Sequence, residues 1–425
     1  MLDRPQTGER AFLVHLSRGK PASADELQEF RALATSAGAE IIDELEVRVD
    51  RPNPRYYTGL GKAEQIAESA RSQGAELILV SQALAPSQER NLERLASVRV
   101  LDRNGLILDI FAQRAATFEG KLQVELAQLE HLSTRLVRGW SHLERQKGGI
   151  GLRGPGETQL ETDRRLIGQR IKRLKLKLDR VQRQREMSRR DRRRSNLPTV
   201  ALVGYTNAGK TTLFNRLSGA TLQAKDQLFA TLDPTIRRLE LNPGEEVLIV
   251  DTVGFVRDLP HELVAAFRAT LTETRDASLL LHVIDASDPH HEDRIRHVRE
   301  VLQQIGAADV PILEVYNKTD RARETRELDA LAGAKLCVSA RTGAGIEDLL
   351  HAIRAQAVGA PVAGRLRLEP AQNRIRAQLF DWDAVKSEQV DSCGRFTLEI
   401  ELSARRWREL SEKEGLSRDC ISQKA

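Results

Sequence analysis

The stretch LPTVALVGYTNAGKTTLFNRL, residues 197–217, constrains the fold of this chain more than any other segment. An apolar run leads into Gly204-x-x-x-x-Gly209-Lys210-Thr211, and an amphipathic run follows, which predicts a strand, a loop and a helix. In that setting the backbone N–H groups of the loop can wrap phosphates, and the helix N-terminus adds a positive dipole end. Lys210 can reach the β- and γ-phosphates of a nucleotide, and the Thr211 hydroxyl can ligate Mg²⁺. The sequence therefore predicts a phosphate loop made of Gly204, Tyr205, Thr206, Asn207, Ala208, Gly209, Lys210 and Thr211.

Three later segments make this pattern specific for a guanine nucleotide. In EVLIVDTVG, residues 246–254, an apolar strand leads to Asp251, which is expected to contact the metal through one of its ligands, and to Gly254, whose N–H can reach the γ-phosphate. In NKTD, the Asp320 carboxylate can accept two N–H groups that guanine presents and adenine does not. In CVSARTGAG, the backbone N–H of Ala340 can donate to guanine O6. The candidate residues from these segments are Asp251, Thr252, Val253, Gly254, Asn317, Lys318, Thr319, Asp320, Ser339, Ala340 and Arg341.

The segment DQLFATLDPT, residues 226–235, is expected to be the first switch, where a threonine closes over Mg²⁺ when γ-phosphate is present. Thr231 and Thr235 compete for that role, and chemistry alone does not choose between them. The candidate nucleotide contacts in this segment are Phe229, Ala230, Thr231, Leu232 and Asp233.

No residue of the sequence stands out as the group that positions the attacking water. Phe255 follows Gly254, where many signalling GTPases have a glutamine, and a phenyl ring cannot orient water. The catalytic group is therefore unknown: backbone, another side chain, a monovalent ion or a partner could serve. Asn207 stands where some cation-dependent GTPases hold an asparagine that coordinates K⁺, and a structural hydrogen bond within the loop explains it equally well.

Strand and helix patterns alternate up to about residue 105, which predicts a small α/β domain. The expected strands are 11–17, AEIIDELEVRV, 75–81 and SVRVLD, with helices between them. Tyr56, Tyr57 and Lys62 lie in a Gly-containing loop that could touch a ligand, but the sequence favours an ordinary surface turn.

Leucines then recur at spacings of three and four along 122–136, and apolar residues do the same along 167–181, which predicts two antiparallel helices. The stretch GGIGLRGPG, residues 148–156, connects them. Its Gly149-x-Gly151-x-x-Gly154 spacing matches a dinucleotide-binding fingerprint, but that fingerprint requires a preceding strand, and the preceding residues here are helical and charged. We expect a loop that approaches another surface closely, and we assign the contacts with that surface to Gly149, Gly151, Arg153, Gly154, Arg164 and Arg165.

The formal net charge of +5 conceals a strong asymmetry. Between Arg164 and Arg194 there are fifteen Lys and Arg residues and three acids, a local charge of +12, so the rest of the chain sums to about −7. Because so few acids are interleaved, a phosphate-rich partner explains the segment better than a solvated helix face does.

The remaining composition fits a cytoplasmic protein. No apolar run is long enough to span a bilayer, the N-terminal residues MLDRPQTGER lack an apolar signal core, and peripheral membrane association is not indicated. The three cysteines share no motif spacing, as is typical of a protein from a reducing cytosol.

Together, GGIGLRGPGETQLETDRR, GYTNAGKT, LFATLDPT, DTVGF and NKTD resemble the HflX-type GTPases of the Obg–HflX group. The resemblance covers nearly the whole chain and is densest from about residue 100 to 350. It implies Mg²⁺ as cofactor, with Thr211 and Thr231 as metal ligands by motif position. It also implies binding to the large ribosomal subunit and splitting of stalled or idle ribosomes. The family's N-terminal region has been linked to ATP and RNA remodelling, but the sequence contains no second phosphate loop.

The sequence thus predicts a multi-domain α/β protein, expected to be a monomer that binds GTP and GDP. The expected parts are an N-terminal α/β domain (1–110), a helical hairpin (111–195) with a Gly-rich loop at 148–158, a GTPase domain (197–360) and a small α+β domain (361–425). Three functions remain open: splitting of ribosomes, maturation of the large subunit, and GTP-gated ribosome binding without splitting.

Overall fold

The computed structural model describes residues 8–139, 155–194, 197–220, 228–229, 231–242, 245–257, 268–321, 335–359, 362–391, 394–402, 404–414, 416 and 421–422. The chain forms two compact units. The first contains residues 1–187, 225–233 and 256–270, and the second contains 188–224, 234–255 and 271–425. In the described part of the chain, no helix is both long and apolar enough to cross a membrane.

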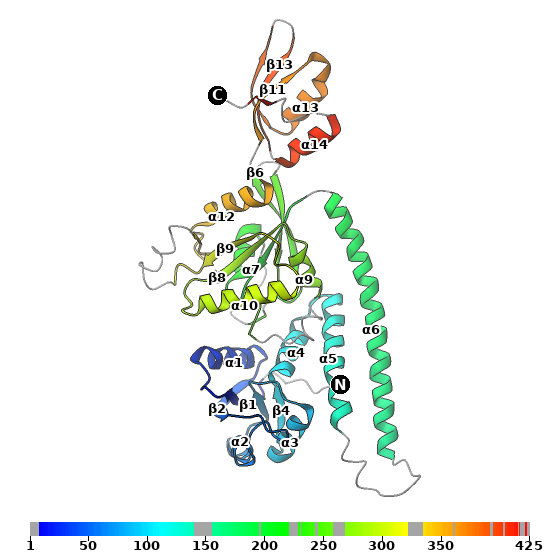
Figure 1. Ribbon diagram of the computed structural model, residues 1–425, viewed down its shortest axis with the longest axis vertical. Coiled ribbons are helices and arrows are strands. Elements are labelled where there is room, and N and C mark those ends of the chain that lie inside the picture. Colours follow the sequence, from blue (N-terminus) through cyan, green and yellow to red (C-terminus); the bar gives the residue numbers. More distant parts are fainter. Residues whose placement is uncertain are drawn as a thin grey trace. The chain divides into compact units, whose positions relative to one another are not determined.

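The first unit begins with a four-stranded parallel sheet in the order β2-β1-β3-β4 (Figure 1). Its strands are β1 (Arg10–Arg18), β2 (Glu40–Val49), β3 (Leu77–Val80) and β4 (Arg99–Asp102). The connecting helices are α1 (Ala24–Ser36), α2 (Leu60–Ser72) and α3 (Pro86–Ala96). Helix α1 begins with a capping box between Ser23 and Glu26, and α3 begins with a proline, whose missing N–H costs nothing in a first turn. The predicted alternation of strands and helices is confirmed.

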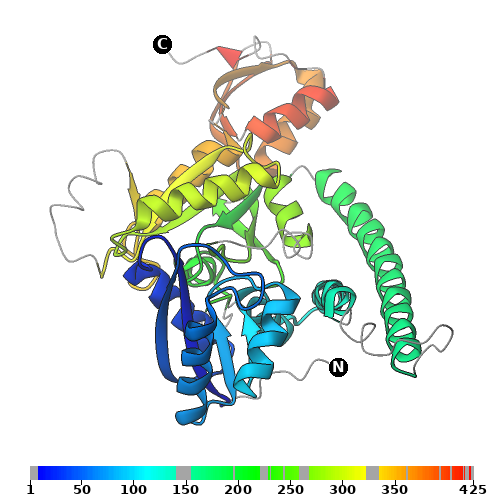
Figure 2. The ribbon, with the colours of Figure 1, turned by 60° about the horizontal axis from the view of Figure 1, so that its bottom comes forward.

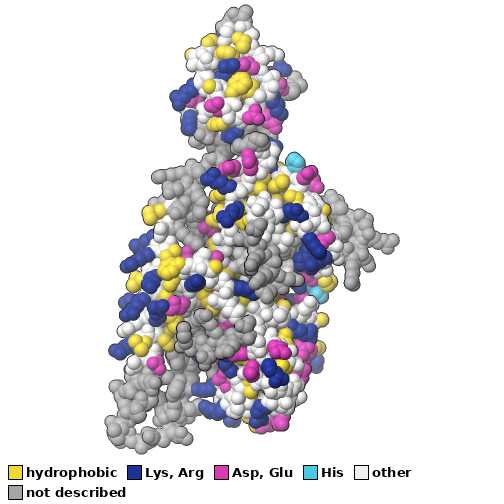
Figure 3. All heavy atoms as spheres, turned by 180° about the vertical axis from the view of Figure 1, so that it is seen from behind, with side chains coloured by type: hydrophobic (Ala, Val, Ile, Leu, Met, Phe, Trp, Pro, Cys, Tyr) yellow, Lys and Arg dark blue, Asp and Glu magenta, His cyan; other side chains and the backbone are white. Residues whose placement is uncertain are grey.

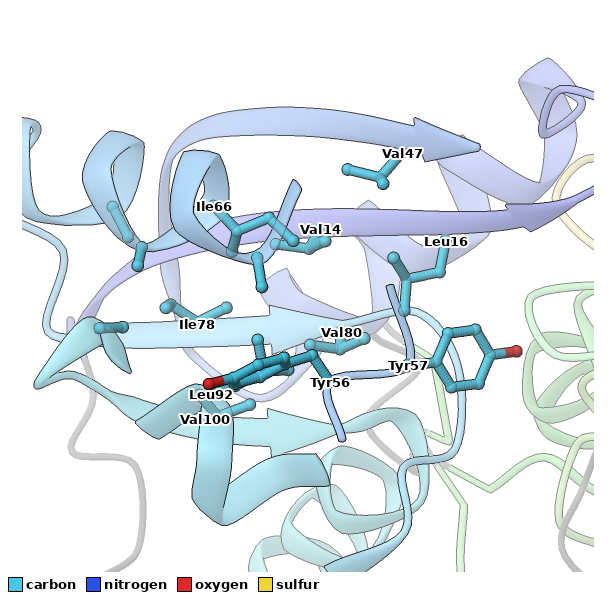
Figure 4. Close-up of a cluster of buried hydrophobic side chains, with 14 of the residues drawn as sticks. Val14, Leu16, Val47, Tyr56, Tyr57, Ile66, Ile78, Val80, Leu92 and Val100 are labelled. Atoms are coloured by element: carbon cyan, nitrogen blue, oxygen red, sulfur yellow. The ribbon is translucent and has the colours of Figure 1, made fainter. Parts of the chain in front are cut away.

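The core of this sheet contains two tyrosines that the sequence placed on a surface turn. Tyr56 and Tyr57 are 7% and 4% exposed and pack among Val14, Leu16 and Val80 (Figure 4). The backbones of Tyr57 and Asn53 exchange two hydrogen bonds of 2.8 Å, so the segment turns inward and satisfies its polar groups locally. The prediction of an ordinary surface turn is therefore wrong for both tyrosines.

Helix α4 (Arg103–Arg114) follows β4 directly, and the Asp102 carboxylate caps it by accepting from the Gly105 N–H at 2.8 Å. Helices α5 (Phe118–Gly139) and α6 (Pro155–Arg194) then form the two long arms (Figure 1). Buried Leu122 of α5 packs against Leu174 and Leu178 of α6. The predicted apolar seam is confirmed at these positions, and the forty residues of α6 extend roughly 60 Å.

The second unit contains a six-stranded sheet in the order β10-β9-β8-β5-β7-β6. All neighbouring strands are parallel except β6 and β7. Helices α7 and α12 pack on one face, through Phe214 and Leu349 among others, and α10 covers the other face through Val298 and Leu302 (Figure 2). The elements are β5 (Thr199–Val203), α7 (Lys210–Ser218), β6 (Thr235–Asn242), β7 (Glu245–Asp251), α9 (Arg268–Arg275), β8 (Leu279–Asp285), α10 (His291–Gln304), β9 (Ile312–Asn317), β10 (Leu336–Cys337), α12 (Ile346–Ile353) and the π-helical turn η1 (Arg354–Val358).

The C-terminal part of this unit is a four-stranded sheet in the order β12-β13-β11-β14. The chain order of its strands and two α-helices is β-α-β-β-α-β. Leu379 of α13 and Trp407 of α14 pack on one face of the sheet. The elements are β11 (Val362–Leu368), the 3-10 turn η2 (Pro370–Gln372), α13 (Asn373–Asp381), β12 (Val385–Val390), β13 (Phe396–Leu402), α14 (Ala404–Glu414) and β14 (Ile421–Ser422).

Candidate guanine-nucleotide site

The phosphate loop joins the end of β5 to the start of α7, as the sequence predicts. Gly209 has a φ of +90°, and a Cβ placed on it would lie 2.3 Å from Asn317 Nδ2. Only glycine fits here, because the loop passes directly under the segment expected to hold the base. The N-terminal N–H groups of α7 therefore open onto a cradle suited to phosphates.

Lys210 is buried inside this loop, and its surroundings shift the pKa of its ammonium group. Its Nζ donates to the carbonyl oxygens of Gly204 and Tyr205 at 3.1 and 2.7 Å. Burial lowers the pKa of the Lys210 ammonium to about 8, although the Asp251 carboxylate favours its charged form. An ammonium so poorly solvated is well prepared to bind phosphate oxygens.

Thr211 and Asp251 lie together at the ends of α7 and β7. The Thr211 hydroxyl donates to Asp251 Oδ2 at 2.9 Å, and Asp251 is fully buried. A hydroxyl and a carboxylate oxygen are the hard ligands that Mg²⁺ prefers, so this pair fits the ion. Bound there, Mg²⁺ would neutralise charge that develops between the β- and γ-phosphates.

The residues expected to read guanine converge at the ends of β9 and β10. Asn317 donates to the Ala208 carbonyl at 2.9 Å and accepts from the Ala340 N–H at 2.9 Å, which ties this end of the site to the phosphate loop. The Ser339 hydroxyl donates to Asp320 at 2.6 Å, and this bond lowers the pKa of the exposed Asp320 carboxyl. Asp320 is thus ionised at neutral pH, as acceptance of two N–H groups requires.

Comparison with known proteins identifies the family. The chain matches three family models: a GTP-binding GTPase N-terminal region at 24–112, a GTP-binding GTPase middle region at 114–192, and a 50S ribosome-binding GTPase at 199–318. It is 51% identical over 418 residues to the GTPase HflX of Escherichia coli (strain K12), covering 97% of this chain and 98% of that protein. The chain belongs to the HflX family of GTPases.

The chain is also similar to further proteins. The HflX of Magnetococcus marinus is 48% identical over 365 residues, which cover 84% of each chain. A solved structure of the GTP-binding protein SsGBP with GDP is 26% identical, with a TM-score of 0.48, and covers 82% of this chain and 98% of that one. As an HflX GTPase, the protein hydrolyses GTP to GDP and phosphate, and the family uses Mg²⁺.

Most of the segment expected to be the first switch, residues 226–233, belongs to the first compact unit, whereas the phosphate loop belongs to the second. The Leu228 N–H donates to the Ser36 hydroxyl at 3.0 Å, and the Phe229 ring meets the Phe111 ring edge-on at 4.6 Å between centroids. Leu232 is buried and Thr231 and Asp233 are half-buried, whereas Ala230 lies outside the described residues.

The segment that follows Gly254 is divided between the two units. Phe255 is buried and belongs to the second unit, where its N–H donates to the Gly204 carbonyl at 3.1 Å. Arg257 belongs to the first unit and donates to Glu26 at 2.7 Å, while its carbonyl accepts from Arg103 at 3.0 Å.

The remaining candidates fall into three groups. Thr252 and Val253 are buried, and the Thr252 hydroxyl donates to the Leu202 carbonyl at 2.5 Å. Asn207 is exposed with a φ of +62°. Arg164 and Arg165 are exposed on α6, whereas Gly149, Gly151, Arg153 and Gly154 lie outside the described residues.

Motif spacing does not predict two residues that contact the site, Asp285 and Arg294. Lys318 has a left-handed φ of +65°, and its Nζ lies 2.8 Å from Asp285 at the end of β8. The Arg294 guanidinium lies 4.9 Å from the centre of the Tyr205 ring. Asp285 could have been found as an acid that ends an apolar strand beside NKTD, but nothing in the sequence pairs Arg294 with Tyr205.

Proposed function

We propose that this HflX chain binds the large ribosomal subunit in its GTP-bound form and uses its two long arms to separate ribosomal subunits. The matching family model is described as a 50S ribosome-binding GTPase, and the chain aligns with HflX proteins over nearly its full length. The proposal extends these likenesses to a partner and an action for this chain.

The charge of α6 supports an RNA partner. Lys and Arg side chains line the described part of this helix, at the left of Figure 3. Arg170 and Lys175 pair with Glu125 and Glu130 of α5 at 2.6 and 2.9 Å, but Lys172 and Arg173 are exposed. Exposed cations on a rigid helix suit a partner that presents closely spaced phosphates.

The observation that carries the proposal is a contact between the first switch and the start of α5. Asp233 accepts from the N–H groups of Ala116 and Thr117 at 2.9 and 2.8 Å and from the Thr117 hydroxyl at 2.5 Å. The same hydroxyl accepts from the Gly120 N–H at 3.0 Å and so caps α5. A carboxylate at this helix end is also stabilised by the helix dipole.

This contact supports nucleotide control of the arms. Asp233 stands two residues after Thr231, which we propose as the switch threonine that closes over Mg²⁺. If γ-phosphate draws Thr231 to the metal, Asp233 must move with it and the cap of α5 must change. The hydrogen bonds at the start of α5 would then depend on whether GTP or GDP is bound.

The proposal assigns roles to the remaining candidates. The backbone N–H groups of Gly204 to Thr211 and the Lys210 ammonium would hold the phosphates, Asp251 to Gly254 the metal and the γ-phosphate, and residues 317–320 and 339–341 the guanine base. Thr211 and Thr231 would ligate Mg²⁺, and Asn207 would coordinate K⁺. The rRNA contacts would come from Arg164 and Arg165 of α6 and from Gly149, Gly151, Arg153 and Gly154.

The same proposal gives the chain four functional parts, with boundaries near 110, 195 and 360. The protein would act as a monomer in the cytoplasm, where ribosomes are found, and ribosomes would stimulate its hydrolysis of GTP.

Sucrose-gradient analysis of 70S ribosomes tests the proposal. With GTP or a non-hydrolysable analogue the protein should convert 70S particles into subunits, and with GDP it should not. If the protein binds with the analogue and leaves 70S particles intact, it is a gated binder and the splitting function is wrong. If immature large-subunit particles accumulate in cells that lack the protein while 70S particles stay intact in vitro, the maturation function replaces it.

A further inference from the structure

The HflX chain has phenylalanine where a water-positioning glutamine would stand, and the structure shows that Phe255 cannot approach water by a small movement. Phe255 is 2% exposed. Its N–H donates to the Gly204 carbonyl at 3.1 Å, and its carbonyl accepts from the Thr206 N–H at 2.8 Å. Phe255 is thus bound to the phosphate loop by both backbone groups, so a group other than its side chain must hold the attacking water.

Three groups converge beside this backbone pairing. A Cβ placed on Gly254 would lie 2.8 Å from Cα and Cγ2 of Thr206 and 2.9 Å from Nζ of Lys210. Under the proposed nucleotide site, Gly254 and Lys210 are the residues that contact the γ-phosphate. Thr206 is therefore the third residue next to the position expected for the γ-phosphate, and it presents a side chain of the phosphate loop there.

The Thr206 hydroxyl is available for this task. The residue is 3% exposed, and its buried Oγ1 has no hydrogen-bond partner among the residues that the structure describes. By contrast, the Thr252 hydroxyl donates to the Leu202 carbonyl and the Thr211 hydroxyl donates to Asp251. Valine would fill the space of Thr206 without burying an unsatisfied hydroxyl. Packing therefore does not explain why a polar atom, whose burial is unfavourable, stands at this position.

The orientation of the side chain is compatible with the role. Cγ2 of Thr206 faces Gly254, and the hydroxyl and methyl groups share one Cβ. Rotation about χ1 by about 120° therefore brings Oγ1 to the point that Cγ2 occupies.

We propose that the Thr206 hydroxyl orients the water that attacks the γ-phosphate of GTP; this inference rests on the proposed nucleotide site. Oγ1 accepts a hydrogen bond from the water and keeps its own proton throughout. The water oxygen forms the new bond to phosphorus as the bond between the γ-phosphorus and the bridging oxygen breaks. GDP leaves with that electron pair, and the water proton passes to the phosphate product.

The test compares Thr206→Val, which removes only the hydroxyl, with Thr206→Ser, which keeps it. Single-turnover hydrolysis of GTP by the full-length chain should fall about 100-fold in T206V, the size of effect seen when one polar group that acts on a reacting atom is removed. T206S should retain hydrolysis within about tenfold of the wild-type rate. Affinities of T206V for GDP and a non-hydrolysable GTP analogue should stay within about threefold of wild type, because the hydroxyl acts on water.

Thermal unfolding of the same variants separates catalysis from structure. T206V should unfold at the same temperature as wild type or higher, since it removes a buried unsatisfied hydroxyl. Wild-type hydrolysis by T206V, or a parallel loss of stability and of affinity for both nucleotides, would overturn the inference. Unchanged affinity of Asp320→Asn for GTP would instead refute the proposed nucleotide site.

Discussion

At the scale of single residues, the proposed specificity for guanine depends on Asp320, an exposed residue whose carboxylate is fixed by a hydrogen bond. Ser339 donates to one carboxylate oxygen at 2.6 Å, and Ser339 itself is buried. The carboxylate is therefore oriented before a base arrives, which lowers the entropic cost of binding.

Replacing that carboxylate tests the assignment of the base. Asp320→Asn places an amide donor opposite the N–H groups of guanine and should weaken GTP binding by roughly 1.5–3 kcal/mol. Xanthine nucleotides, which present an acceptor there, should bind the variant better than GTP does. Titration with fluorescent GTP and XTP measures both affinities, and an unchanged affinity for GTP would disprove the role of Asp320.

The buried Lys210 predicts how binding depends on pH. In the free protein its pKa is lowered to about 8, and phosphate oxygens favour the charged ammonium, so binding of GTP should raise this pKa. GTP binding should therefore take up a proton at about pH 8.5, and affinity should fall by up to about tenfold per pH unit above the free pKa. Near neutral pH, where Lys210 is already charged, this group should contribute almost no pH dependence.

Calorimetry in two buffers of different ionisation enthalpy measures that proton directly. Equal binding enthalpies in both buffers at about pH 8.5 would show that Lys210 does not change its protonation. Asp320→Asn provides the control, because it should weaken binding and leave the proton uptake unchanged.

At the scale of helices and strands, the two long arms are held together by an apolar seam more than by ion pairs. Leu174 is 1% exposed in that seam, whereas Lys175 and Glu130 of the neighbouring ion pair are 56% and 35% exposed. Leu174→Ala should lower the free energy of unfolding of the hairpin by about 2–5 kcal/mol, and Lys175→Ala by less than about 1 kcal/mol. Hydrogen exchange along α5 and α6 measures both, and equal effects would contradict the packing described here.

Much of this architecture follows from sequence patterns, and the exceptions have physical causes. The strands of the first sheet and the phosphate loop have strong local signals, because period and motif are properties of short segments. Tyr56 and Tyr57 were misplaced because a Gly-containing loop resembles a surface turn until tertiary packing draws its rings inward. The contact of Asp233 with Thr117 could not be predicted, since it joins residues more than a hundred positions apart by a capping interaction that has no sequence spacing.

At the scale of the whole molecule, the concentration of positive charge on α6 predicts how the proposed ribosome binding responds to salt. Reversing Lys172 and Arg173 to Glu should weaken binding to large subunits and lower the steepness of its salt dependence by about 1 for each phosphate that the helix no longer neutralises. The matched control is reversal of Arg365 and Arg367, which are exposed on β11 and change the net charge equally. Equal losses of affinity in both variants would show that net charge alone, and not α6, attracts the ribosome.

The proposed coupling of nucleotide to arms is tested most directly by the affinity of the full-length chain for isolated large subunits in two nucleotide states. Co-sedimentation should give a dissociation constant at least about tenfold lower with a non-hydrolysable GTP analogue than with GDP. Asp233→Ala and Thr117→Val each remove hydrogen bonds between Asp233 and the start of α5, one variant from each side of the contact. Both variants should reduce the ratio of the two dissociation constants. Equal affinity of the wild-type chain with the analogue and with GDP would contradict the proposed coupling.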